Sequence, residues 1–253
     1  MAAPLEALLA RPVAHRGLHD AARGVIENTA SAVKAAIDRG FNIEVDLQVS
    51  ADGEAMVHHD DALGRLAEGA APLATLGAKE LARLPFRATA DRMMALAELL
   101  ELVSGRVGLL IELKSRRDGD LRLVERCAQL LPAYRGACAV MSFDPGLIAA
   151  LRARAPRLAR GLVAERHYQV PAKPGAGWTL AASVHTFSLA HLLHAPMTRP
   201  DFIAYRVDDL PVPATRLARA LGRPVFTWTV RTAAQRERAA RWADQMIFEG
   251  FVP

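Results

Sequence analysis

The sequence predicts an α/β protein built as one (β/α)8, or TIM, barrel domain over residues 1–253. Three observations favour this fold. Apolar runs typical of buried strands alternate with amphipathic segments typical of helices. The length of 253 residues is usual for such a barrel. No segment of distinct composition divides the chain. A doubly wound open sheet is the alternative, but no glycine-rich phosphate-binding sequence follows the first strand.

The first predicted unit runs from a strand through a loop and a helix to a second strand. Residues 12–15 form a short apolar strand, and the helix after the loop begins near Asn28, a good N-cap residue. Gly40 ends that helix. The next strand, at 43–49, alternates apolar and polar residues and turns back at 51–53 through an Asp-Gly pair, which is typical of a hairpin.

Strands and helices continue to alternate through the rest of the chain. Residues 61–92 are rich in Gly and Pro and are expected to form loops with a short helix near 78–84. A second irregular stretch covers 171–177. The eight predicted strands lie near residues 13, 43, 109, 139, 160, 204, 227 and 247. The later predicted helices span residues 93–103, 120–131, 146–155, 213–221 and 232–242.

Composition excludes several classes of protein. The chain is 51% hydrophobic and 23% charged, which is ordinary for a globular protein. Its net charge of +5 comes mostly from arginines spread among acidic residues, so a nucleic-acid surface is not expected. No run of 18 apolar residues and no secretory signal are present, so we expect a cytoplasmic protein without membrane insertion. Cys127 and Cys138 are expected to pack as small apolar residues.

The chemistry of the chain is expected to centre on residues 43–60. Glu44 and Asp46 share one face of their strand, because residues two apart point to the same side. The hairpin then brings His59 and Asp60 near them. Alternating acids on a strand often form only a solvated face, but helices are expected to cover both sides of this one. Buried carboxylates are costly unless they are paired or bind a metal.

Four segments bring polar groups to the end of the barrel where the strands terminate, and sites form at that end. They contain His15 and Arg16, Glu44 and Asp46, His59 and Asp60, and Glu112 and Lys114. Three carboxylates without cysteine indicate a site for Mg²⁺ or Ca²⁺. Two histidines beside this site suit proton transfer. The positive charges of Arg16 and Lys114 suit the binding of an anionic small molecule. Metal-assisted attack on a phosphoester follows as the expected reaction.

With these residues in place, the chain resembles the glycerophosphodiester phosphodiesterase family. HRG, ENT, E-x-D and HD in this order and spacing are specific to it. The matching pieces are VAHRG at 13–17, IENT at 26–29, IEVDLQVSADG at 43–53, VHHD at 57–60, LLIELK at 109–114, MSFDP at 141–145 and PVFTWTVRT at 224–232. The resemblance implies a TIM barrel that hydrolyses glycerophosphodiesters to sn-glycerol 3-phosphate and an alcohol.

The resemblance also assigns roles to individual positions. It implies that His15 and His59 are the acid/base histidines and that Glu44, Asp46 and Glu112 bind the divalent cation. Substrate contacts would come from Arg16, Lys114 and Trp228. Glu27 would lie at the mouth near the metal, with a supporting or metal-linked role. The chain departs from the family where an aspartate and proline usually follow the last strand, because Glu249 stands there. It also has little room at 61–92 for the small subdomain that many members insert.

Two other functions remain open at this stage. Related barrels with the same histidines and acids cleave lysophospholipids in the manner of a phospholipase D and release a cyclic phosphate. A barrel that only binds an anion is the non-enzymatic alternative, although it would not need two histidines. Among the neighbouring residues, His58 is expected to be structural, and Asp60 either orients His59 or caps a turn.

Overall fold

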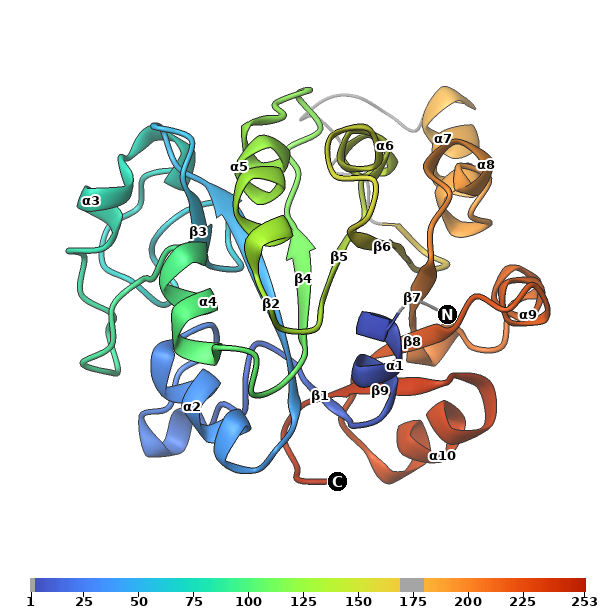
Figure 1. Ribbon diagram of the computed structural model, residues 1–253, viewed down its shortest axis with the longest axis horizontal. Helices are drawn as coiled ribbons and strands as arrows, with labels where there is room; N and C mark the ends of the chain where they lie inside the picture. The colour runs from blue at the N-terminus through green and yellow to red at the C-terminus, as the bar shows by residue number, and fades with distance from the viewer. Residues whose placement is uncertain (1–2, 169–179) are drawn as a thin grey trace.

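A computed structural model describes residues 3–168 and 180–253, in which eight parallel strands close into a barrel surrounded by helices (Figure 1). Strand β1 pairs with both β9 and β2, which closes the barrel. The predicted fold is confirmed, and each strand contains its predicted position. The strands are β1 (Val13–Ala14), β2 (Asn42–Val49), β4 (Leu109–Leu113), β5 (Cys138–Ser142), β6 (Ala159–Ala164), β7 (Phe202–Arg206), β8 (Val225–Val230) and β9 (Gln245–Phe248).

Helices follow the strands and cover the outside of the barrel (Figure 1). The irregular stretch predicted at 171–177 lies outside the described residues. No helix in the described part of the chain is long and apolar enough to span a membrane. The α-helices are α1 (Ala3–Leu9), α2 (Ala30–Asp38), α3 (Ala78–Leu81), α4 (Leu96–Val103), α5 (Arg122–Leu130), α6 (Pro145–Arg154), α7 (Leu180–Ala190), α8 (Ala195–Thr198), α9 (Pro213–Ala220) and α10 (Ala233–Trp242). Short 3₁₀ helices are η1 (Ala21–Arg23), η2 (Leu73–Thr75), η3 (Leu131–Ala133) and η4 (Val207–Asp209).

The alternation of side chains along β2 separates the outer layer from the barrel interior. Ile43, Val45 and Leu47 are fully buried against the apolar residues of the surrounding helices. Glu44 and Asp46 lie between them in the sequence and therefore point to the interior. Both faces of this strand are buried, as expected for a parallel sheet with helices outside.

The barrel interior changes character along the strands. Val13, Leu110, Phe202 and Phe226 belong to an apolar cluster in the interior. Two residues further along, His15 just after β1 and Glu112 in β4 take the same inward direction. The interior is thus packed with hydrocarbon at one end and lined with ionisable groups at the end where the strands terminate, which is where the sites of such barrels form.

Helix α1 closes the apolar end of the barrel and is absent from the prediction made from sequence. Leu5 and Leu8 of this helix are buried in the interior cluster. Asn42 Nδ2 donates to three main-chain carbonyl oxygens in α1 and the residues after it, each at 3.1 Å. The Asn42 side chain also accepts from the Gly108 amide at 2.8 Å. One amide side chain therefore ties α1 to two barrel strands.

The segment from β3 to α4 forms a small unit beside the barrel, at the left of Figure 1. Strand β3 (Ala55–Val57) pairs antiparallel with β2, as the hairpin prediction required. Residues 61–92 contain η2, α3 and loops, and they have an apolar cluster of their own that includes Leu73, Leu81 and Phe86. The segment is thus short but still packed, which lets it hold polar side chains over the barrel mouth.

We predict that Gly161→Ala destabilises the barrel by about 1–3 kcal/mol, the usual cost of overpacking a core. Gly161 faces the interior opposite its register partner Phe202, and a methyl group there would overlap the buried Phe202 ring. Urea unfolding measures the loss. Gly77→Ala is the matched control, because its φ of −73° suits alanine and its nearest neighbour is 3.6 Å away. Equal midpoints for Gly161→Ala and the wild type would contradict this packing.

Candidate active site

The register of the parallel strands brings the predicted site residues together. Ala14 pairs with Ile43 of β2, so His15 continues the ladder beside Glu44. Asp46 of β2 pairs directly with Glu112 of β4. Residues that are far apart in the sequence therefore lie on neighbouring strands at the same height of the barrel.

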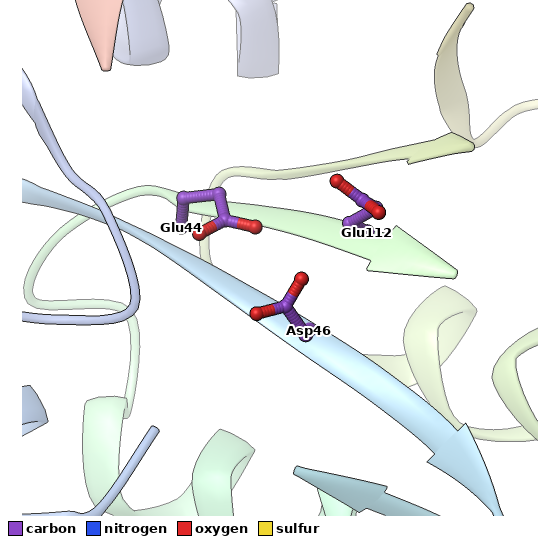
Figure 2. A group of neighbouring side chains, drawn as sticks. All are labelled: Glu44, Asp46 and Glu112. Atoms are coloured by element: carbon purple, nitrogen blue, oxygen red, sulfur yellow. The ribbon is translucent and has the colours of Figure 1, made fainter. Parts of the chain in front are cut away.

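Three carboxylates form an acidic group at this height. Glu44, Asp46 and Glu112 each supply one oxygen, and the three oxygens lie within 4.8 Å of one another. Figure 2 shows the three carboxylates turned toward a common point between β2 and β4. Only 1% of Glu44, 1% of Asp46 and 7% of Glu112 is exposed, so water does little to screen their repulsion. Oxygen donors alone, in a buried cluster, are the ligand set that Mg²⁺ and Ca²⁺ prefer.

Two cations partly neutralise the acidic group. Lys114 Nζ lies 2.8 Å from Asp46 Oδ1 and 2.5 Å from Glu112 Oε1, so the ammonium bridges the two acids. Arg16 donates its main-chain N–H to Glu44 Oε2 at 3.0 Å, and its Nε lies 3.1 Å from Asp46 Oδ2. The Arg16 guanidinium also donates to Glu27 Oε1 at 2.7 Å.

The two cations act more strongly on Asp46 than on Glu44, so the pKa values of these two acids shift in opposite directions. Burial, followed by the charges of Asp46 and Glu112, raises the pKa of Glu44 well above its ordinary value. Burial also acts to raise the pKa of Asp46, but Lys114 and Arg16 outweigh it and hold that pKa well below its usual range. When all three acids are ionised, they carry more negative charge than Arg16 and Lys114 balance, so further positive charge would stabilise the ionised form of Glu44.

Asn28 has a different role from the one predicted for it. Thr29 rather than Asn28 is the N-cap of α2, and its hydroxyl accepts from the Ala32 amide. Asn28 is buried with a positive φ of 58°, and its Nδ2 donates to Asp46 Oδ2 at 2.9 Å. The Asp46 amide donates back to Asn28 Oδ1 at 3.3 Å. The N-cap prediction was wrong because the Asn28 carboxamide is used to orient a carboxylate of the site.

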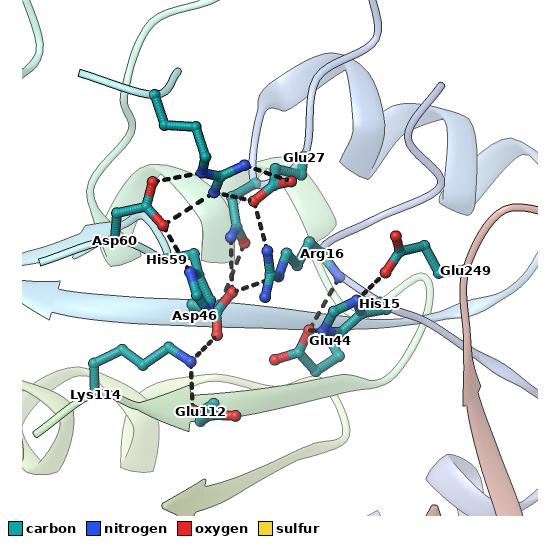
Figure 3. Close-up of polar contacts among 12 residues, drawn as sticks. His15, Arg16, Glu27, Glu44, Asp46, His59, Asp60, Glu112, Lys114 and Glu249 are labelled. Carbon is teal, nitrogen blue, oxygen red and sulfur yellow. Dashed lines mark hydrogen bonds and ion pairs between the residues drawn. The ribbon is translucent and has the colours of Figure 1, made fainter. Parts of the chain in front are cut away.

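Both predicted histidines face the site, and a carboxylate contacts Nδ1 of each ring (Figure 3). His15 Nδ1 lies 2.6 Å from Glu249 Oε2, and His59 Nδ1 lies 2.8 Å from Asp60 Oδ1. His15 and His59 stand on either side of the acidic group in Figure 3. His58 instead packs its buried ring near Phe86. The extended chain thus turns only one ring of the tandem pair toward the site, as expected.

A cavity of about 340 Å³ opens at the mouth of the barrel, and all eight predicted site residues line it. Trp228 forms part of the wall together with Phe143, whose ring meets the indole edge-on at a centroid distance of 5.4 Å. The eight residues are His15, Arg16, Glu44, Asp46, His59, Glu112, Lys114 and Trp228. The remaining polar wall contains Glu165, Arg206, Asp208, Thr229 and Arg231.

Sequence reasoning missed the residues that hold the site in place. Arg65 lies in the small unit beside the barrel, and its guanidinium donates to Asp60 Oδ2 at 2.7 Å and to Glu27 Oε1 at 2.7 Å. The prediction left the role of Glu249 open, although this residue contacts His15. Asp60 orients the ring of His59 by the contact described above. Hydrogen bonds from Arg65 and His59 outweigh the effect of burial and lower the pKa of Asp60 to about 2.

Comparison with known proteins places this geometry among related barrels. A family model described as the glycerophosphoryl diester phosphodiesterase family matches residues 15–252. A curated relative named glycerophosphodiester phosphodiesterase, from Caldanaerobacter subterraneus subsp. tengcongensis, is 26% identical over 187 residues, which cover 70% of this chain and 73% of the relative.

Solved structures share the fold over nearly the whole chain. A phosphodiesterase from Oleispira antarctica, in complex with the product sn-glycerol-3-phosphate, is 20% identical with a TM-score of 0.74, covering 96% of this chain and 94% of that one. A glycerophosphodiester phosphodiesterase from Thermotoga maritima is 21% identical with a TM-score of 0.68, covering 94% of each chain.

Proposed function

The chain belongs to the glycerophosphoryl diester phosphodiesterase family and is a phosphoric diester hydrolase, and from this premise we propose that it cleaves glycerophosphodiesters with two histidines and a divalent cation. Its products are sn-glycerol 3-phosphate and an alcohol, and residues 1–253 act as one catalytic domain. One observation carries the proposal. A single cavity is lined by a three-carboxylate group and by two histidines that each use Nδ1 for a carboxylate.

Glu44, Asp46 and Glu112 fit a Mg²⁺ or Ca²⁺ ion by the chemistry of their donors. All three are carboxylates, and their oxygens converge. The positively charged Lys114 ammonium already bridges Asp46 and Glu112, so this position favours a cation. A bound divalent ion would stabilise negative charge on the phosphoryl oxygens. The raised pKa of Glu44 supports the same assignment, since it reflects a buried acid crowded by two others.

Arg16 and Lys114 bind the phosphate of the substrate in this proposal. Both line the cavity, and both stay charged because the neighbouring acids raise their pKa against the effect of burial. The planar guanidinium offers paired N–H donors to phosphate oxygens, and the ammonium acts as a point charge. Glu27 and Asp46 hold the Arg16 guanidinium, so its orientation is set before the substrate arrives.

His15 and His59 move the protons. One imidazole takes a proton from the attacking oxygen as the new P–O bond forms. If that oxygen is the glycerol hydroxyl rather than water, the first product is a cyclic phosphate, which water opens in a second step to sn-glycerol 3-phosphate. The other imidazole gives a proton to the alcohol oxygen as the old P–O bond breaks. Each ring does this through Nε2, because Nδ1 is in contact with Glu249 or Asp60. Trp228 and Phe143 form an apolar wall for the carbon atoms of the substrate.

We predict that His15→Ala and His59→Ala each reduce turnover of glycerophosphocholine by at least about a hundredfold, the usual contribution of a general acid or base. Release of sn-glycerol 3-phosphate measures the rate, and circular dichroism verifies the fold. His191→Ala is the matched control, because that exposed histidine packs on Phe187 rather than in the cavity. Wild-type turnover in either cavity variant would refute the two-histidine mechanism.

We also predict that millimolar Mg²⁺ or Ca²⁺ raises the unfolding temperature of the protein by several degrees. A ligand at about a hundred times its Kd stabilises a fold by about 2.7 kcal/mol. The rise should be small or absent in Glu112→Gln, which loses one charged ligand, and should persist in Glu101→Gln, whose carboxylate is on the exposed face of α4. Differential scanning calorimetry with and without EDTA makes the comparison. The same rise in wild type and Glu112→Gln would mean that the acidic group does not hold the ion.

A further inference from the structure

The two histidines of the cavity are held in the same way by unrelated parts of the chain. Glu249 contacts Nδ1 of His15 and accepts from Arg231 Nη2 at 3.0 Å. Asp60 contacts Nδ1 of His59 and accepts from Arg65 Nε at 2.7 Å. Each imidazole therefore has a carboxylate behind it and an arginine behind the carboxylate. Asp60 is next to its histidine in the sequence, whereas Glu249 is 234 residues away from His15.

Closure of the barrel sets the distance between Glu249 and His15. Ala14 pairs with Phe248, so the next residues on the two strands stand side by side. The His15 amide donates to the Phe248 carbonyl at 3.0 Å, and the Glu249 amide donates to the Val230 carbonyl at 3.0 Å. Main-chain hydrogen bonds thus fix the positions from which both side chains start, and the contact does not depend on a flexible loop.

The chemistry of the contact selects one tautomer of His15. The hydrogen bond from His15, together with the charges of His15 and Arg231, outweighs burial and lowers the pKa of Glu249 to about 2, so this carboxylate is ionised. An ionised carboxylate can only accept, so the nitrogen that it contacts at 2.6 Å carries the hydrogen. Nε2 of the same ring lies 4.0 Å from Glu44 Oε2, beyond hydrogen-bonding distance. In the neutral imidazole, Nε2 therefore keeps its lone pair on the side of the cavity.

We propose that Glu249 is a positioning residue for His15, which holds the imidazole as its Nδ1–H tautomer and aims Nε2 at the substrate. This role rests on the proposed function of His15 in proton transfer. Without the carboxylate, the ring can rotate about its side-chain bonds and exchange tautomers, so only part of the population presents Nε2 correctly. Misplacement of a reacting group by about 1 Å can reduce a rate by about a hundredfold.

Arg231 supports the same contact from the far side. Its guanidinium donates to the Glu249 oxygen that also contacts His15, and it follows β8, which is paired with β9. The arginine keeps Glu249 charged and limits its movement. A role as metal ligand does not fit Glu249, because the three acids whose oxygens converge are Glu44, Asp46 and Glu112.

Glu249→Ala and Glu249→Gln test the proposal, with Glu237→Gln on the exposed side of α10 as the matched control. We expect Glu249→Ala to lower kcat for glycerophosphocholine by about ten- to a hundredfold with KM within about twofold of wild type. Glu249→Gln should recover part of kcat, because its amide oxygen can still accept from Nδ1–H. The control should keep wild-type values. Wild-type kcat in Glu249→Ala, or a change in KM alone, would overturn the proposal.

The tautomer gives a readout that a purely structural role would not alter. Nitrogen-15 NMR of the His15 ring should report Nδ1–H in the wild type and in Glu249→Gln, and a mixture of tautomers in folded Glu249→Ala. An unchanged tautomer in Glu249→Ala would refute the positioning role. This spectrum needs no substrate. If the wild type failed to cleave glycerophosphodiesters, the proposed function would fall, while the NMR result would still decide whether Glu249 sets the state of His15.

Discussion

The burial of three carboxylates at one point of the barrel is the constraint on which the rest of the site depends. Glu44, Asp46 and Glu112 come from adjacent strands whose register places them at one height. Three like charges so close together, and so little exposed to water, would oppose folding if nothing balanced them. The surrounding residues are arranged to supply that balance. Lys114 and Arg16 do so with charge, and Asn28 does so with a hydrogen bond to Asp46.

Lys114 and Arg16 do not fully neutralise the three carboxylates, and this links the stability of the fold to the chemistry of the site. Asp46 has two cationic neighbours and a lowered pKa, whereas Glu44 is crowded by acids and has a raised one. A site in this state gains from a divalent cation, whose added charge would let an anionic phosphate lie beside Arg16 and Lys114. The geometry thus suits a phosphodiester and a divalent ion together. Each cavity histidine meanwhile contacts a carboxylate at Nδ1, which leaves Nε2 for the proton transfer that we propose.

Much of this arrangement could be predicted from the sequence, because the place of a residue along its strand sets its height along the axis of a parallel barrel. Strands near 43 and 109 carry acids at matched positions, so a common site followed from the fold. The residues that sequence reasoning missed depend on tertiary structure. Glu249 reaches His15 only because β9 closes on β1, and Arg65 reaches Asp60 and Glu27 only because its loop folds over the mouth. Helix α1 has only seven residues, too few for its apolar spacing to be distinctive.

Asn28 shows a second reason why sequence reasoning can assign the wrong role to a residue. A polar residue before an amphipathic helix is typical of an N-cap, and Thr29 beside it satisfies the same rule. Asn28 differs from Thr29 in its left-handed backbone and its contact with Asp46, and neither feature can be recognised without the fold.

Anomalous diffraction from a crystal grown with Mn²⁺ tests the central claim most directly. The account predicts one strong peak within about 2.0–2.6 Å of an oxygen from each of Glu44, Asp46 and Glu112, the distance range of hard divalent cations. A crystal in which the ion binds elsewhere, or in which Lys114 still bridges Asp46 and Glu112 with no ion among the acids, would contradict it.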